Sequence, residues 1–151
     1  SDIEAMETKI LFGLNWLVNP PTPQSFVYQF IHLFLCMAPN LSCYAMTIYE
    51  VANYIAEVSL LQPQVRDEKA STLAFASLLV ALREVKNTIL NPQDYANFVR
   101  TILSFGFVSA DKVASVADNI EDSLQSDDGH LTTEQVYERL DPTGAVYGTV
   151  E

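Results

Sequence analysis

The sequence predicts an all-α protein in which five helices form one box around a central buried helix at about residues 67–86. The run from Lys69 to Lys86 (KASTLAFASLLVALREVK) is apolar on almost every side of a helix, which is typical of a helix buried on all sides. Elsewhere, apolar residues recur every three or four positions, which is helical spacing. No segment alternates apolar and polar residues as a half-buried strand does. One further helix at the N-terminus and an acidic tail complete the predicted architecture.

Length and charge exclude several classes of function. The 151 residues suit one domain, which at this size buries about 70% of its unfolded surface. The net charge is −11, and residues 111–151 carry ten acids against two bases, whereas residues 1–110 carry nine against six. Because Lys and Arg are not clustered, neither nucleic acid nor an anionic membrane is a predicted partner. The central run is also shorter than the roughly 20 residues of a membrane span.

No residue is predicted to be catalytic, to bind a cofactor or to hold a metal. Cys36 and Cys43 imply no disulfide framework and are expected to be small buried thiols in a reducing compartment. His32 and His130 are remote from each other, and the glycines form no phosphate-binding loop. The acidic first residues do not resemble a signal peptide. A non-enzymatic intracellular protein, nuclear and/or cytoplasmic, is therefore expected.

Residues 2–18 are predicted to form the first helix, capped by Ser1 or Asp2. Its apolar stripe consists of Met6, Ile10, Leu14 and Leu17, with Ile3 and Trp16 beside it. The prolines of residues 20–23 end this helix, because proline lacks the backbone N–H and biases the residue before it toward extended geometry.

Two helices follow this corner. Thr22 is predicted to cap the first of them, with Pro23 at its first position and its end at Met37 or Ala38. Its apolar positions are Phe26, Phe30, Leu33, Phe34 and Met37. These aromatics would also suit a pocket for a small apolar ligand, although a core is the commoner use of such spacing. The next helix is predicted at residues 41–61, with Tyr44, Ile48, Val51, Ile55, Val58 and Leu61 at helical spacing.

The second half of the box consists of the central helix and two more. The central helix is expected to be capped by Asp67 or a residue nearby. Asn91 and Pro92 open the next helix, and Gly106 ends it. Its inner face is predicted to be Tyr95, Phe98, Val99, Ile102 and Leu103. Ser109 is predicted to cap the last helix, in which Val113, Val116, Ile120 and Leu124 face inward while Asp111, Asp118, Glu121 and Asp122 form a solvated acidic face.

The character of the chain changes at residue 125. Residues 126–129 form a predicted turn, residues 131–140 a short helix capped by Thr132 or Thr133, and residues 141–151 an irregular end. The turn invites comparison with a calcium-binding EF-hand loop. With Gly129 at loop position 6, however, Leu124 and Gln135 occupy the two positions that need a carboxylate, so no calcium site is predicted.

Three motifs, met in order along the chain, resemble motifs of the cyclin family. The pattern ME-x-x-IL-x-x-L-x-W at residues 6–16, followed by PPTP-x-x-F at residues 20–26, resembles the junction between the two cyclin boxes. The run ANYIAEVSLL at residues 52–61 resembles the second helix of the C-terminal box. The run ASTLAFA at residues 70–76 resembles the alanine-rich start of its central helix, although Lys69 replaces a proline that the family often has.

This resemblance implies a division of the chain. Residues 1–18 would be the last helix of an N-terminal cyclin box, residues 19–124 the C-terminal box, and residues 125–151 an acidic tail that matches no family motif. The chain would then be a fragment, consistent with its start at Ser1 rather than Met.

The function that the resemblance implies is that of a regulatory subunit which binds and activates a cyclin-dependent kinase. In this family the first box makes most of the kinase contact, so no kinase-contact residue is predicted in this chain. Exposed apolar residues of the first helix are expected to promote self-association. A cyclin-fold adaptor in transcription stays open as the alternative, through protein contacts rather than DNA contacts, because residues 1–110 carry more acids than bases.

Overall fold

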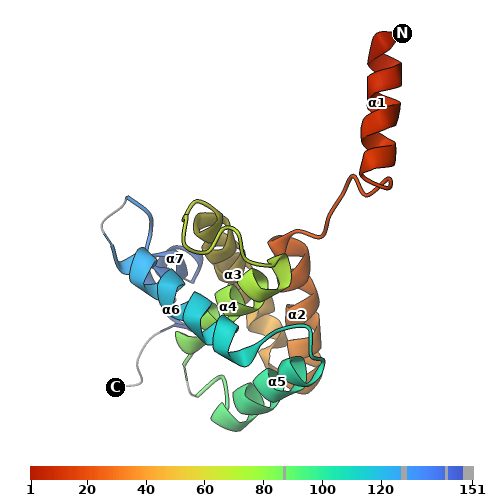
Figure 1. The fold of residues 1–151 in the computed structure, drawn as a ribbon. Helices are drawn as coiled ribbons and strands as arrows, with labels where there is room; N and C mark the ends of the chain where they lie inside the picture. The colour runs from red at the N-terminus through yellow and green to blue at the C-terminus, as the bar shows by residue number, and fades with distance from the viewer. Residues whose placement is uncertain (87, 127–128, 142, 148–151) are drawn as a thin grey trace.

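The computed structural model describes residues 1–86, 88–126, 129–141 and 143–147, and Figure 1 shows their course. Within these ranges the chain is helical, has no strand and contains one isolated β-bridge. None of the described helices is long and apolar enough to cross a bilayer. The elements are α1 (Asp2–Gly13), α2 (Pro23–Met37), the 3-10 helix η1 (Pro39–Tyr44), α3 (Ala45–Leu60), α4 (Ala70–Arg83), α5 (Pro92–Ser104), α6 (Ala110–Gln125) and α7 (Thr133–Leu140).

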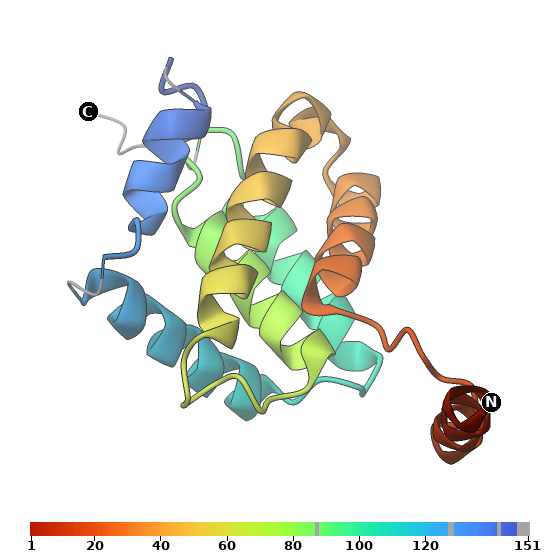
Figure 2. The same cartoon turned by 90° about the horizontal axis from the view of Figure 1, so that it is seen from above.

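Helix α4 is the centre of the bundle, as the sequence predicts. Every residue from 72 to 82 is buried. Helices α2, α3 and α6 pack against it and lie around it in the view of Figure 2. Its four alanines allow this close approach, since their side chains add little bulk between helices.

The central helix is shorter than the predicted 67–86 at both ends. Lys69, not Asp67, is its N-cap, in extended geometry and without a side-chain hydrogen bond. At the other end Val85 leaves the helix to form a β-bridge with Tyr147, and the Lys86 N–H donates to the Val146 carbonyl at 2.9 Å. The backbone groups of residues 85–86 therefore pair with the end of the chain instead of continuing the helix.

Four phenylalanine rings fill the space between α2, α4 and α5. The rings of Phe34 and Phe98 meet edge to face at 5.0 Å, and Phe75 lies 5.5 Å from Phe30 and 5.9 Å from Phe98. All four residues are buried. The aromatic positions of α2 therefore serve the core, as helical spacing favours, rather than lining a ligand pocket.

Helix α1 lies away from the bundle in Figures 1 and 2, and none of its residues is buried. The Ser1 cap is confirmed, because its Oγ accepts from the Glu4 N–H and the Glu4 side chain completes a capping box. The predicted end at residue 18 is wrong. Asn15 and Trp16 adopt positive φ angles of 49° and 61°, which turn the chain out of the helix, and the Trp16 ring packs edge-on against Phe12.

Other helix ends follow their predicted caps. Thr22 and Asn91 accept from the backbone N–H groups of Ser25 and Gln93, and Gly106 has a φ of 76° at the predicted stop. Ser109 precedes α6 but makes no capping hydrogen bond with its side chain. The predicted helix 41–61 is instead η1 followed by α3, because Pro39 starts a tighter turn that buries Leu41.

The expectation that both cysteines are buried is wrong, since Cys36 and Cys43 are exposed free thiols. Helix α2 buries Val27, Phe30, Ile31 and Phe34. Cys36 lies two positions after Phe34, which places it on the opposite side of the helix. Cys43 belongs to η1, whose buried residue is Leu41.

The chain beyond α6 packs onto the bundle, although its last residues were expected to be irregular. Helix α7 lies against α3, and its Tyr137 hydroxyl donates to the Ala81 carbonyl of α4 at 2.6 Å. The Leu131 N–H donates to the Tyr54 hydroxyl at 2.8 Å, and Val146 is buried. Thr132 caps α7 with a full capping box, as predicted. The middle of the predicted turn (residues 127–128) and residues 142 and 148–151 of the predicted tail lie outside the described residues.

Candidate functional site

Over the described part of the chain, no group of three or more His, Cys, Asp or Glu side chains is placed to hold a metal ion. His32 is exposed and lies edge-on against Tyr28, 4.3 Å between ring centres. Three surface features are candidates for binding another molecule. They are an apolar surface on α1, an exposed aromatic pair after α5, and a pocket lined by carboxylates between α4, α6 and α7.

The apolar surface of α1 includes the residues that follow the helix. Its members are large apolar side chains left exposed: Ile3, Met6, Ile10, Phe12, Leu14, Trp16, Leu17 and Val18. A helix of 12 residues is marginal in water when it stands alone, because few hydrogen bonds offset the entropy of nucleation. Large apolar side chains gathered on an exposed helix are typical of a protein interface. Helix α1 therefore has the properties of a helix that packs against another body.

We expect Ile10→Lys to suppress self-association of this chain. The wild-type chain should form concentration-dependent oligomers through the apolar surface of α1, and a charge at its centre should weaken them at least about tenfold, because a buried unpaired lysine is costly. Sedimentation equilibrium measures the dissociation constant. Met46→Lys, at an exposed methionine of α3, is the matched control. Equal weakening by both changes would contradict the role of α1.

The exposed aromatic pair is Phe105 and Phe107, in the turn between α5 and α6. The two rings stack at 6.1 Å, and Phe107 also stacks on Phe30 of α2 at 6.2 Å. The two exposed rings are thus connected, through Phe30, to the buried phenylalanine rings of the core.

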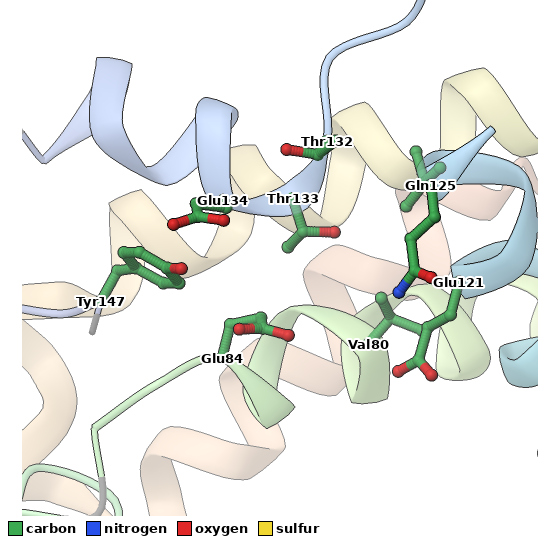
Figure 3. Close-up of a pocket in the computed structure, with 9 residues that line it drawn as sticks. Val80, Glu84, Glu121, Gln125, Thr132, Thr133, Glu134 and Tyr147 are labelled. Carbon is green, nitrogen blue, oxygen red and sulfur yellow. The ribbon is translucent and has the colours of Figure 1, made fainter. Parts of the chain in front are cut away.

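The pocket lies where the end of α4 meets the end of α6 and the start of α7, as Figure 3 shows. We call it the acidic pocket. It has a volume of about 250 Å³ and is lined by Val80, Glu84, Glu121, Leu124, Gln125, Thr132, Thr133, Glu134 and Tyr147. The sequence analysis recognised only Glu121 among its carboxylates, as part of a solvated face. Glu84 is the C-cap of α4, whereas Glu121 belongs to α6 and Glu134 to α7, so no sequence spacing could have identified them as neighbours.

Among the described residues, Arg83 is the only base that forms an ion pair with a carboxylate of this pocket. The Arg83 Nη1 lies 2.6 Å from the Glu121 Oε1 and 3.9 Å from the Asp118 Oδ1, so the predicted acidic face of α6 is partly neutralised. Lys86 instead bonds the Gly144 carbonyl through its Nζ. Among the residues that the structure describes, no base forms an ion pair with Glu84 or Glu134.

The charges of the pocket shift the pKa values of its members. Although Glu84 is exposed overall, partial desolvation of its carboxylate raises its pKa, and the charges of Glu121 and Glu134 add to this rise. Desolvation also raises the pKa of Tyr147 to about 12, with further contributions from its hydrogen bond to Glu134 and from nearby glutamate charges. The pocket therefore disfavours additional negative charge.

We expect Glu84→Gln to stabilise the protein at neutral pH. A carboxyl whose pKa is raised on folding contributes stability below its ordinary pKa of 4.5, and that stability is lost as the pH rises through the folded pKa. The gain at pH 7 should be less than about 1 kcal/mol, because solvent screens an exposed group. Thermal unfolding at pH 7 and at about pH 4 measures it, and the difference from wild type should vanish at the lower pH. Glu50→Gln, on the exposed side of α3, is the matched control.

Comparison with known proteins identifies the domain. The model of the family described as the cyclin C-terminal domain matches residues 21–143. This range begins just before α2 and includes α7, whereas α1 precedes it. No curated protein and no solved structure matches the chain. The match covers most of the chain. The helical fold of the chain agrees with the predicted box. The resemblance noted in the sequence is therefore confirmed. The chain belongs to the cyclin family.

Proposed function

We propose that this chain is the C-terminal box of a cyclin, a regulatory subunit that binds and activates a cyclin-dependent kinase in cell-cycle control. The match of residues 21–143 to the cyclin C-terminal domain is the observation that carries the proposal. The order of the three sequence motifs supports it independently, since they occur at the junction, the second helix and the central helix of the box. Its proposed location is the nucleus and/or the cytoplasm.

The proposed mechanism is allosteric rather than catalytic. A subunit that binds the active conformation of a kinase more tightly than the inactive one shifts the kinase toward activity, and only this difference in affinity produces the shift. In cyclins the first box makes most of that contact. The role proposed for residues 19–147 is therefore to support a preceding box through a stable, well-packed core.

We further propose that α1 is the last helix of that preceding box. Its exposed apolar side chains and the lack of any buried residue support this role, because a helix at the edge of another box would bury such a surface there. The family match to the C-terminal domain also begins only after α1.

The test is a pull-down from cell extract with two baits. One is this chain, and the other is a longer form in which an N-terminal cyclin box precedes α1. Bound cyclin-dependent kinases are identified by mass spectrometry, and the kinase activity of the bound fraction is measured on a peptide substrate. We expect the longer form to recover an active kinase and this chain to recover little or none, because the main contact lies in the first box.

Other outcomes separate the alternatives. Recovery of a kinase by both baits would assign a kinase-binding surface to the C-terminal box itself. Recovery of no kinase by either bait would overturn the regulatory-subunit proposal and favour the protein-only adaptor in transcription. An extract from cells arrested at a different stage is the control for a kinase that is present only transiently.

A further inference from the structure

We propose that two copies of this chain exchange α1, so that α1 of each copy packs its apolar surface on the exposed aromatic pair of the other. Lys69 and Lys112 lie beside Phe107 and complete the receiving surface. The product is a dimer with two identical contacts, a closed arrangement that leaves no surface open for further copies. The inference involves no kinase, so its failure would leave the proposed function unaffected. In a longer form, a preceding box would compete for α1.

The apolar surface of α1 is large enough for a stable interface. A large side chain that is about half exposed offers roughly 100 Å², so its eight members offer about 800 Å² together. This area equals the share of one partner in a protein interface of standard size. Because the exchange makes the contact twice, even partial burial of the apolar surface of α1 reaches the area of a stable dimer.

The connection between α1 and α2 favours a contact with another copy over a contact within the same copy. In Figures 1 and 2, α1 lies away from its own bundle. Pro20 and Pro21 lie in the connection, and Pro23 opens α2. Because proline fixes its own φ and favours extended backbone in the residue before it, this connection holds α1 away from the bundle instead of folding it back. Domain exchange is a low-cost route to a dimer, and short hinges favour it.

Charge complementarity identifies α1 as the occupant of the receiving surface. Helix α1 carries three acids against one lysine. Beside Phe107, the two bases Lys69 and Lys112 outnumber Glu68, although the net charge of the chain is −11. Lys112 pairs with Glu68 at 3.2 Å, whereas among the described residues no acid forms an ion pair with Lys69. The receiving surface therefore combines exposed aromatic rings with positive charge, and α1 combines exposed apolar side chains with negative charge.

The test mixes two single variants of the full chain, each of which disables one side of the contact. Ile10→Lys places a charge on α1, and Phe105→Lys places one on the aromatic pair. Alone, each variant should dimerise at least about tenfold more weakly than wild type in sedimentation equilibrium, because each contact then buries an unpaired lysine. In the mixture, α1 of the Phe105→Lys chain meets the intact aromatic pair of the Ile10→Lys chain. We therefore expect mixed dimers that are tighter than those of either variant alone.

Two outcomes would overturn the exchange. If α1 instead pairs with α1 of the other copy, Phe105→Lys should dimerise like wild type. If the mixture associates no better than the separate variants, α1 and the aromatic pair do not bind each other. Tyr28→Lys is the matched control, since Tyr28 is an exposed aromatic residue of α2 outside the receiving surface, and it should weaken the dimer less than about twofold. Circular dichroism verifies that every variant is folded.

Charge reversal tests the electrostatic part of the proposal. Lys69→Glu should weaken the dimer about fivefold, because it places an acid against the acidic helix α1. Arg139→Glu, at an exposed residue of α7, changes the net charge equally and should weaken it less than about twofold. The difference between the two variants should shrink as salt is added, since salt screens exposed charges. Equal weakening by the two changes would show that net charge alone matters and would contradict this receiving surface.

Discussion

Replacing Phe75 by alanine is expected to lower the free energy of unfolding by about 3–5 kcal/mol. Phe75 is fully buried in the middle of α4, and its ring contacts those of Phe30 and Phe98. The change removes the apolar area of the ring and leaves a cavity at the junction of α2, α4 and α5, which the surrounding helices close only partly. The two ring pairs contribute further to the loss. Because domains of this kind have a total stability of about 5–15 kcal/mol, this is a large share.

Urea denaturation followed by circular dichroism measures the effect of Phe75→Ala as a lower midpoint with an unchanged slope. Phe105→Ala is the matched control, because Phe105 is 57% exposed and stacks on Phe107 at the surface. It should cost about 1 kcal/mol or less. A similar loss for both variants would contradict the central position of Phe75 in the core.

Replacing Tyr137 by alanine is expected to cost about 3–4 kcal/mol and to detach α7 from the bundle. Tyr137 is fully buried, stacks on Tyr147 at 5.5 Å and donates its hydroxyl proton to the Ala81 carbonyl at 2.6 Å. Burial and the charge of Glu84 raise the pKa of Tyr137, so the hydroxyl stays protonated and keeps donating. This one side chain thus joins α7, α4 and the end of the chain.

Tyr137→Phe separates the ring from the hydroxyl. It keeps the ring packing and should cost only about 1 kcal/mol, the net value of one hydrogen bond. Hydrogen exchange measured along the chain distinguishes the two variants. In Tyr137→Ala the amides of α7 should lose protection while those of α4 keep it, whereas in Tyr137→Phe the protection of α7 should persist. Loss of protection across all helices in Tyr137→Ala would show instead that α7 unfolds only together with the bundle.

Detachment of α7 bears on the acidic pocket as well. Thr133 and Glu134 belong to the first turn of α7, so the pocket exists only while that helix is docked. The Tyr137→Ala variant should therefore lose the acidic pocket along with the protection of α7. The acidic pocket thus depends on the packing of Tyr137, which joins α7 to the central helix.

Much of the fold was predictable from the sequence because its signals are local. A cap such as Thr22, Asn91 or Thr132 bonds a backbone N–H two or three residues further on, so the residues that decide the helix start are all adjacent in sequence. The central helix was equally predictable, since apolar side chains on all sides of a helix have no stable location except the interior. The family resemblance rests on such local runs as well.

Errors arose where a distant part of the chain decides the outcome. The sequence pattern predicts that residues 85–86 continue the helix. In the structure their backbone instead forms a β-bridge and a hydrogen bond with residues 146–147. The burial of Cys36 depends on which face of α2 meets α4, which the apolar content of the helix does not specify when most of its positions are apolar.

The sequence by itself determined an all-α box, the order of its helices, most of their starts and the identity of the buried centre, because each follows from residues within one or two turns. The tertiary structure alone decided that the chain beyond α6 is part of the folded bundle, since Tyr137 finds its acceptor in α4. It also decided that Glu84, Glu121 and Glu134 share one pocket. Electrostatic interactions and hydrogen bonds act through space, and only the packing of α4, α6 and α7 brings these three helices close enough for those interactions to operate.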